Sequence, residues 1–462
     1  MIRSMWCAAA LAVAGVSFPA YAQDAELSRI REEIRQLKES YEKRIETLER
    51  RLADAETRAG TQVTAASPAT GRAANEAAFN PALSLILQGT AARSSQDPNT
   101  YRISGFTPSR GEVAPAGRGF SLGESELIVS ANIDPYFRGQ LVAALTPENE
   151  LEVEEAFFQT LGLGRGFTLK GGRFLSGIGY QNEIHQHAWD FQDAPLAYKA
   201  FLGGRLNDDG VQLKWLAPTE LFIELGAELG RGRSFPATDR SRNSANAWSL
   251  FGHVGGDLGA SIAWRAGLSH LRASPRDRAF EDVDSLGNPT VQSFTGRSRL
   301  WIADFVLKWA PNRNASVTNF KLQGEYFQRR ETGRLAYDDS AGSALFGSLG
   351  DAFESRQKGW YLQGVYQFVP RWRFGYRYDR LDFGTVNNGI VASGAGPAAA
   401  DFPLLMTEHN PTRHTLMLDW SPTEFSRLRL QLASDKSRFG TTDHQALLQY
   451  IFSLGAHGAH KF

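Results

Sequence analysis

Apolar and polar residues alternate along most of the chain after residue 80, in segments of about ten residues separated by turn residues. In residues 358–368, Leu362 and Tyr366 fall on one face of an extended chain, and Gln363 and Gln367 fall on the other. The same alternation recurs in residues 299–310, 319–329 and 371–382. The pattern predicts antiparallel strands with one apolar face and one charged face.

Counting these segments gives about sixteen strands, the even number typical of single-chain bacterial membrane barrels. They lie at residues 82–91, 120–132, 137–145, 152–161, 167–174, 211–215, 221–229, 247–254, 261–271, 299–310, 319–329, 358–368, 371–381, 414–420, 425–434 and 444–454. Apolar and polar residues also alternate along the strands of a soluble β-sandwich, but there the apolar faces pack against another sheet. Here one face of strand after strand carries charged residues, which suits a water-filled lumen. We therefore predict an all-β fold, a transmembrane antiparallel β-barrel over residues 80–462, closed because an open sheet edge cannot lie in hydrocarbon.

The first eighty residues have a different composition. Residues 1–22 read as a secretory signal peptide, with a short apolar core and a small-residue cleavage site. Residues 24–60 repeat apolar residues in heptads flanked by charges, which predicts an α-helical coiled-coil arm; a single solvated helix is the alternative. Residues 61–79 read as a flexible linker.

Cysteine and charge narrow the possible functions. The one cysteine, Cys7, lies inside the signal peptide, so the exported chain has no disulfide and no thiolate metal site. Lys plus Arg and Asp plus Glu each number 50, a balance that gives no reason to expect nucleic acid as a partner.

One insertion, residues 176–210, is too long for an ordinary connection and is rich in aromatic and ionisable residues. In a barrel it is the natural candidate to fold inward and constrict the lumen. Its ionisable cluster is Glu183, His185, His187, Asp190 and Asp193. Two histidines at i and i+2 of an extended segment point the same way, so His185 and His187 could bind zinc with Asp190 as third ligand. The alternative is that these residues only pack the loop against the wall.

A basic cluster falls on the face that we predict to line the pore. Its members are Arg371, Arg373, Arg377, Arg427, Arg429, Lys321 and Arg329. A ring of arginine or lysine side chains around a pore favours the passage of anions. Pore-lining acidic residues, among them Asp304, Glu325, Asp379 and Asp419, could instead neutralise the arginines, which leaves an anion-leaning or a general pore.

Short motifs add a family resemblance. Residues 155–158 (EAFF), 169–174 (LKGGRF) and 177–179 (GIG) resemble the phosphate-selective porin family, trimeric sixteen-stranded outer-membrane channels. In places the chain is also similar to outer-membrane proteins labelled zinc-regulated TonB-dependent receptors. It departs from true TonB-dependent transporters, whose barrels have about 22 strands and a lumenal plug.

The sequence thus predicts an outer-membrane porin, not an enzyme, through which small solutes diffuse passively. The expected partners are outer-membrane lipid, small solutes and two further copies in a homotrimer, with the arm in the periplasm and no cofactor unless zinc binds. Two alternatives remain open, a dedicated uptake channel for zinc or a metal chelate, and an envelope-tethering protein that acts through its arm.

Overall fold

The computed structural model describes residues 35, 81–109, 113–240, 243–338, 347–394 and 396–455. The predicted signal peptide, coiled-coil arm and linker lie outside these residues, apart from Arg35. Among the described residues, no helix has the length and apolar character that a membrane crossing requires. The account below concerns the unit that spans residues 77–462.

Eighteen antiparallel strands make up one sheet of the described residues. They are β1 (Ala82–Ser94), β2 (Gly119–Leu122), β3 (Ser125–Asn132), β4 (Phe137–Leu145), β5 (Leu151–Thr160), β6 (Phe167–Leu175), β7 (Asn207–Leu216), β8 (Phe222–Gly230), β9 (Ala247–Leu258), β10 (Ile262–Ala273), β11 (Arg278–Val283), β12 (Pro289–Trp309), β13 (Asn319–Asp338), β14 (Ser348–Val369), β15 (Trp372–Asn388), β16 (Thr412–Thr423), β17 (Ser426–Asp435) and β18 (Asp443–Gly455). Most strands pair with the next strand along the chain, and β1 with β3, β10 with β12 and β1 with β18 are further pairings.

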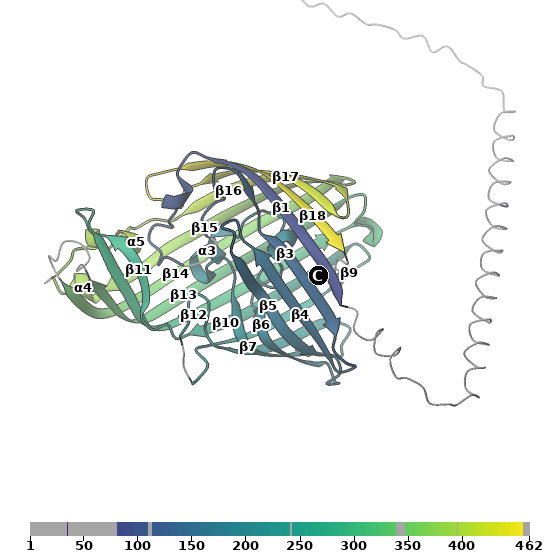
Figure 1. Cartoon of the computed structure of the whole chain (residues 1–462), viewed down its shortest axis with the longest axis horizontal. Coiled ribbons are helices and arrows are strands. Elements are labelled where there is room, and N and C mark those ends of the chain that lie inside the picture. The colour runs from purple at the N-terminus through teal and green to yellow at the C-terminus, as the bar shows by residue number, and fades with distance from the viewer. Residues whose placement is uncertain are drawn as a thin grey trace, which may run out of the picture. The chain divides into compact units, whose positions relative to one another are not determined.

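The eighteen strands occupy sixteen positions around a closed barrel. β2 and β3 pair with successive parts of β1, and β10 and β11 pair with successive parts of β12, so each of these two pairs fills one position. The last strand, β18, pairs with β1 from Ser84↔Gly455 to Ser94↔Gln445, which closes the sheet (Figure 1). The predicted antiparallel barrel and its number of strands are confirmed, whereas the coiled-coil part of the predicted fold lies outside the described residues.

Side chains alternate between a lipid-like outer face and a polar interior. Leu362 exposes 48% of its surface, whereas Gln363 beside it exposes 3%. Phe374 exposes 46%, and Arg377 is completely buried. Such a pattern places hydrocarbon outside and charge inside, as in membrane barrels.

Four strands continue well beyond the length that a bilayer requires. β12, β13, β14 and β15 contain 21, 20, 22 and 17 residues, against about 9–11 for a membrane crossing. Parts of the predicted long connections are therefore strand. The sequence did not indicate these extensions because polar residues occur on both faces of the extended parts, so apolar and polar residues no longer alternate there. The extended parts of these strands pack around an apolar cluster that includes Phe294, Leu335 and Phe402.

The remaining elements are short helices in the connections. They are η2 (Pro98–Thr100), η3 (Gln186–Ala188), α3 (Leu196–Leu202), η4 (Pro311–Arg313), α4 (Gly389–Ala392), η5 (Ala399–Asp401) and α5 (Pro403–Met406). Of these, η3 and α3 belong to the long insertion between β6 and β7, residues 176–206, which we call the inner loop. Its last four predicted residues, 207–210, are already part of β7. Figure 1 shows α3 among the strands, and it contacts β13, β14 and β15.

Candidate functional site

The two ends of the inner loop lie close together, where β6 and β7 pair in the barrel wall. The side chain of Asn182 donates hydrogen bonds to the carbonyls of Ser176 (2.7 Å) and Leu206 (2.9 Å), and its Oδ1 accepts from the Leu206 amide (2.7 Å). Glu228 on β8 accepts from the Gly177 amide (2.8 Å) and from the Ser176 hydroxyl. Both ends of the insertion are therefore fixed before it crosses the interior.

A first anchor inside the barrel is Glu325 on β13. Its carboxylate accepts hydrogen bonds from the backbone amides of Tyr180 (3.2 Å) and Gln181 (3.0 Å). It also accepts from the hydroxyls of Tyr198 (2.9 Å) and Tyr361 (2.6 Å). Glu325 thus holds the loop, rather than neutralising an arginine as one of the sequence interpretations had it.

A second anchor consists of two loop aspartates bound to basic strand residues. Asp190 lies 2.9 Å from Lys321 Nζ and 3.1 Å from an Arg373 nitrogen. Burial alone raises the pKa of Asp190, but the positive charges of Lys321 and Arg373 outweigh it and hold that pKa below its usual value. Among the described residues, the group of potential metal ligands that contains His185 includes neither His187 nor Asp190, so the predicted ligand set His185, His187 and Asp190 does not come together.

Asp193 has three cationic partners. Lys199 Nζ is 3.0 Å away, Arg377 Nη2 is 3.1 Å away, and Arg413 Nη1 is also in contact. Burial raises the pKa of Asp193, and the charges of Arg413, Lys199 and Arg377 more than reverse this, so its pKa lies well below the usual value. Arg413 was not among the predicted pore residues.

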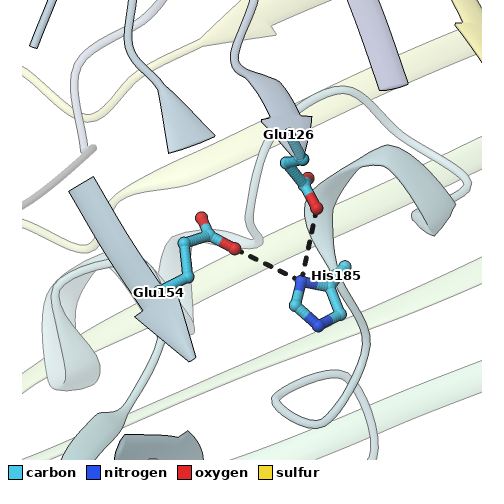
Figure 2. A group of neighbouring side chains, drawn as sticks. All are labelled: Glu126, Glu154 and His185. Carbon is cyan, nitrogen blue, oxygen red and sulfur yellow. Dashed lines mark hydrogen bonds and ion pairs between the residues drawn. The ribbon is translucent and has the colours of Figure 1, made fainter. Parts of the chain in front are cut away.

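On the opposite side of the interior, the two histidines contact glutamates of β3 and β5. Figure 2 shows His185 with Glu126 and Glu154. His185 Nδ1 lies 3.2 Å from Glu154 Oε2 and 3.5 Å from Glu126 Oε2, and its Nε2 lies 3.0 Å from Glu155 Oε2. His187 Nδ1 lies 2.9 Å from Glu126 Oε1. The two imidazole rings stack with their centroids 5.8 Å apart. Burial lowers the pKa of His185, but its hydrogen bonds to Glu154 and Glu155 raise that pKa well above the usual value.

A β-bulge explains why Glu154 and Glu155 both face the histidine. Val142 of β4 pairs with Glu155 and Ala143 pairs with Val153, so Glu154 has no partner in the register. The extra residue rotates the strand locally, and two consecutive side chains point inward. Strict alternation allows only one of them inside, which is why the sequence did not indicate this pair.

Five of the predicted pore residues bind the inner loop, through either its aspartates or its backbone. Lys321, Arg373 and Arg377 bind the loop aspartates as described. Arg427 donates to the Trp189 carbonyl (3.1 Å), and Arg429 donates to the same carbonyl (2.6 Å) and to Gln449 (3.0 Å).

Four further predicted residues have other surroundings. Arg329 is completely buried and donates to the Ala200 carbonyl and Gln357. Asp304 is buried with its carboxylate 4.0 Å from Arg265, and Glu183 lies 3.5 Å from Lys214. Arg371 does not line the interior: it is exposed, with φ 72°, in the turn between β14 and β15. The turn shifts the alternation, so counting back from Arg373 misplaces it.

Comparison with known proteins gives one relative in sequence. No protein-family model matches the chain. An uncharacterized protein of Aquifex aeolicus (strain VF5) is 32% identical over 362 residues, an alignment that covers 75% of this chain and 70% of that protein.

Several solved structures resemble the chain at low sequence identity. A loop L8 deletion mutant of OmpT, an outer membrane protein of Vibrio cholerae, is 10% identical and matches 81% of this chain and 99% of its own with a TM-score of 0.49. The outer membrane channel DcaP of Acinetobacter baumannii is 10% identical, with 81% and 97% covered and a TM-score of 0.47. The anion-selective porin from Comamonas acidovorans is 11% identical, with 81% and 99% covered and a TM-score of 0.45.

Proposed function

The chain belongs to the same protein family as the Aquifex aeolicus protein, and because it folds as a closed barrel with an apolar outer face, we propose that it is an outer-membrane channel. Small solutes would diffuse passively through the interior, which the inner loop narrows. The apolar outer face supports the membrane location, since no soluble barrel needs exposed leucines and aromatic residues on strand after strand.

The inner loop supports a restricted rather than a wide pore. Its anchors reach β3, β5, β8, β13, β15, β16 and β17. The strand residues that it covers, including Glu126, Arg377 and Arg429, are completely buried. Beside it, Lys321 and Arg373 keep 21% and 23% of their side chains exposed. Solutes that pass the loop would therefore meet these two cations.

Charge is unevenly distributed in the interior, although Asp379, Asp419 and Asp435 lie buried among the arginines of β15, β16 and β17. Glutamates gather on β3 and β5, and arginines gather on β15, β16 and β17: Arg373, Arg377, Arg413, Arg427 and Arg429. The observation that carries an anion preference is that Arg427 and Arg429 donate to neutral acceptors. Within the described residues neither forms an ion pair with a carboxylate. Arg427 is partly exposed and Arg429 is buried beneath the inner loop, and their two positive charges would make the electrostatic potential beside the loop more positive and so attract anionic solutes.

Conductance in planar bilayers tests this function. Under a KCl gradient the purified protein should give steady ohmic steps and a reversal potential that indicates anion preference. Arg427→Gln together with Arg429→Gln should move the reversal potential toward cation preference. The matched control is Arg371→Gln, because Arg371 is exposed in a turn and should leave selectivity unchanged. Absence of any conductance would refute the channel, and an unchanged potential in the double variant would refute the anion site.

The assembly follows from the sequence rather than from the described residues. We propose a homotrimer in the bacterial outer membrane, with residues 24–60 as a periplasmic coiled coil. The tethering alternative rests on those same residues. The metal-uptake alternative has one specific observation in its favour, the contact between histidine and two glutamates described above.

A further inference from the structure

Three side chains from three separate segments point one polar atom each at a common place (Figure 2). Glu126 comes from β3, Glu154 from the bulge of β5 and His185 from the inner loop. One potential ligand atom from each residue lies within 4.8 Å of the other two, and both Glu126 Oε2 and Glu154 Oε2 approach His185 Nδ1. The group is deeply buried: Glu126 exposes 0% of its side chain, Glu154 1% and His185 17%.

The other polar atom of each side chain is already held by a neighbour. Glu126 Oε1 accepts from His187 Nδ1 at 2.9 Å, and Glu154 Oε1 accepts from Arg205. His185 Nε2 lies 3.0 Å from Glu155 Oε2. Metal-binding histidines almost always donate their second ring N–H to a carboxylate or carbonyl, and metal-binding carboxylates are hydrogen-bonded in turn. The three converging atoms are thus the ones that these outer contacts leave pointing inward.

We propose that Glu126, Glu154 and His185 bind one divalent first-row transition-metal ion, of which Zn²⁺ is the probe of choice. A tetrahedral site with bonds of about 2.0–2.1 Å places its ligand atoms roughly 3.3 Å apart. His185 Nδ1 lies 3.2 Å from Glu154 Oε2 and 3.5 Å from Glu126 Oε2, which fits two edges of that tetrahedron. An imidazole among the ligands favours zinc and its neighbours over Mg²⁺ or Ca²⁺.

The excess negative charge of the surrounding glutamates also favours a bound cation. Glu124, Glu126, Glu154 and Glu155 supply four buried carboxylates. Arg205 bridges Glu124 and Glu154, and Lys170 attracts Glu155. By the contacts of the described residues, two negative charges remain for the histidines or an ion to balance. One divalent cation supplies that charge with neutral imidazoles.

An unsatisfied atom points to the same place. Glu126 Oε2 is buried and has no hydrogen-bond partner among the described residues. A carboxylate oxygen in that state is costly unless a cation or a donor reaches it. The competing explanation is that His185 carries a proton on each nitrogen and the cluster binds no metal at all.

The site would act as a cross-link. It joins the inner loop to β3 and β5, on the side of the interior opposite to the contacts of Asp190 and Asp193. Three protein ligands leave a fourth tetrahedral position for water or a solute atom. The proposal does not depend on the barrel conducting ions.

Metal binding to the full-length, folded protein tests the proposal. The protein is stripped with chelator, titrated with Zn²⁺ by calorimetry, and loaded with Co²⁺ to read ligand geometry from its visible absorption. Wild type should bind one ion per chain, and millimolar Mg²⁺ should not displace it. Glu126→Gln and Glu154→Gln keep the side-chain size and should each weaken binding by about tenfold or more. Glu183→Gln, which changes the charge of the same loop beside Lys214, should bind as wild type does.

Two results would overturn the metal site. One is no stoichiometric Zn²⁺ binding by folded wild type, which identifies a protonated histidine cluster instead. The other is equal affinity in Glu126→Gln, Glu154→Gln and Glu183→Gln. X-ray absorption of the Zn²⁺-loaded wild type adds a test that needs no variant to fold, because the proposal requires one imidazole with oxygen ligands.

Discussion

At the scale of single residues, Asp193 of the inner loop depends on several cationic partners. Lys199, Arg377 and Arg413 all reach its carboxylate, and its side chain is 10% exposed. Removal of one partner from a buried ion cluster leaves uncompensated charge and costs about 3–5 kcal/mol. We therefore expect Asp193→Asn to lower the free energy of unfolding by about that amount.

The pH dependence of this loss has a definite sign. The pKa of Asp193 in the folded protein lies well below the value of about 3.9 in unfolded chains. A depressed pKa stabilises the fold above the unfolded pKa, and that contribution disappears as pH falls through the folded pKa. The stability difference between wild type and Asp193→Asn should be constant from pH 7 to about 4 and shrink below it.

Denaturant unfolding in lipid vesicles, repeated across pH, measures this difference. Asp239→Asn serves as control because Asp239 pairs with Arg231 at the surface, with 48% of its side chain exposed. Exposed pairs contribute about 1 kcal/mol or less. If Asp193→Asn were no less stable than Asp239→Asn, the loop would not depend on this cluster.

At the scale of elements, the start of the inner loop depends on a glycine in the left-handed region. Gly179 has φ +67°, and a Cβ there would collide with Glu325 Oε2 and lie 2.8 Å from the Tyr198 hydroxyl. Gly179→Ala therefore carries backbone strain of roughly 1–2 kcal/mol and also displaces the Glu325 carboxylate from the Tyr180 amide. We expect the first turn of the loop to detach, with larger and noisier conductance.

Limited proteolysis of the folded barrel, together with conductance, reads out this change. Gly259→Ala is the matched control, since Gly259 has φ +65° but its Cβ would meet nothing within 4 Å. Both variants carry the same strain, and only Gly179→Ala should expose the loop to protease. Equal behaviour of the two variants would assign the effect to strain alone.

At the scale of the whole molecule, the outer face should behave as a surface in contact with lipid. Leu362 lies within β14 and exposes 48% of its surface. An arginine on the lipid face of a barrel costs about 2–4 kcal/mol at the bilayer midplane. Leu362→Arg should reduce the free energy of folding into vesicles by an amount in this range.

The control for this test is Leu286→Arg. Leu286 is 73% exposed in the turn between β11 and β12, outside any strand. Its replacement should leave folding into vesicles nearly unchanged. A similar cost at both positions would mean that the outer face of β14 does not contact hydrocarbon.

Local patterning was sufficient to predict the barrel. The period of two in residues 358–368 or 371–381 depends only on which neighbouring side chains are apolar, and water and lipid impose it on each strand separately. The alternation therefore located the membrane-spanning strands and the inward position of Arg373 and Arg377. The long insertion was found for the same reason, because it interrupts the pattern.

Contacts between distant segments were decided by the tertiary structure. The bulge that turns Glu154 and Glu155 inward appears only in the pairing of β4 with β5. Asp190 was expected beside His185 because they are near in sequence, yet β13 and β15 provide Lys321 and Arg373 to it, and β3 and β5 provide glutamates to His185. Sequence spacing sets which way a side chain points along one segment. Closure of the barrel sets which partners it meets, because only then do strands far apart in the chain face one another across the interior.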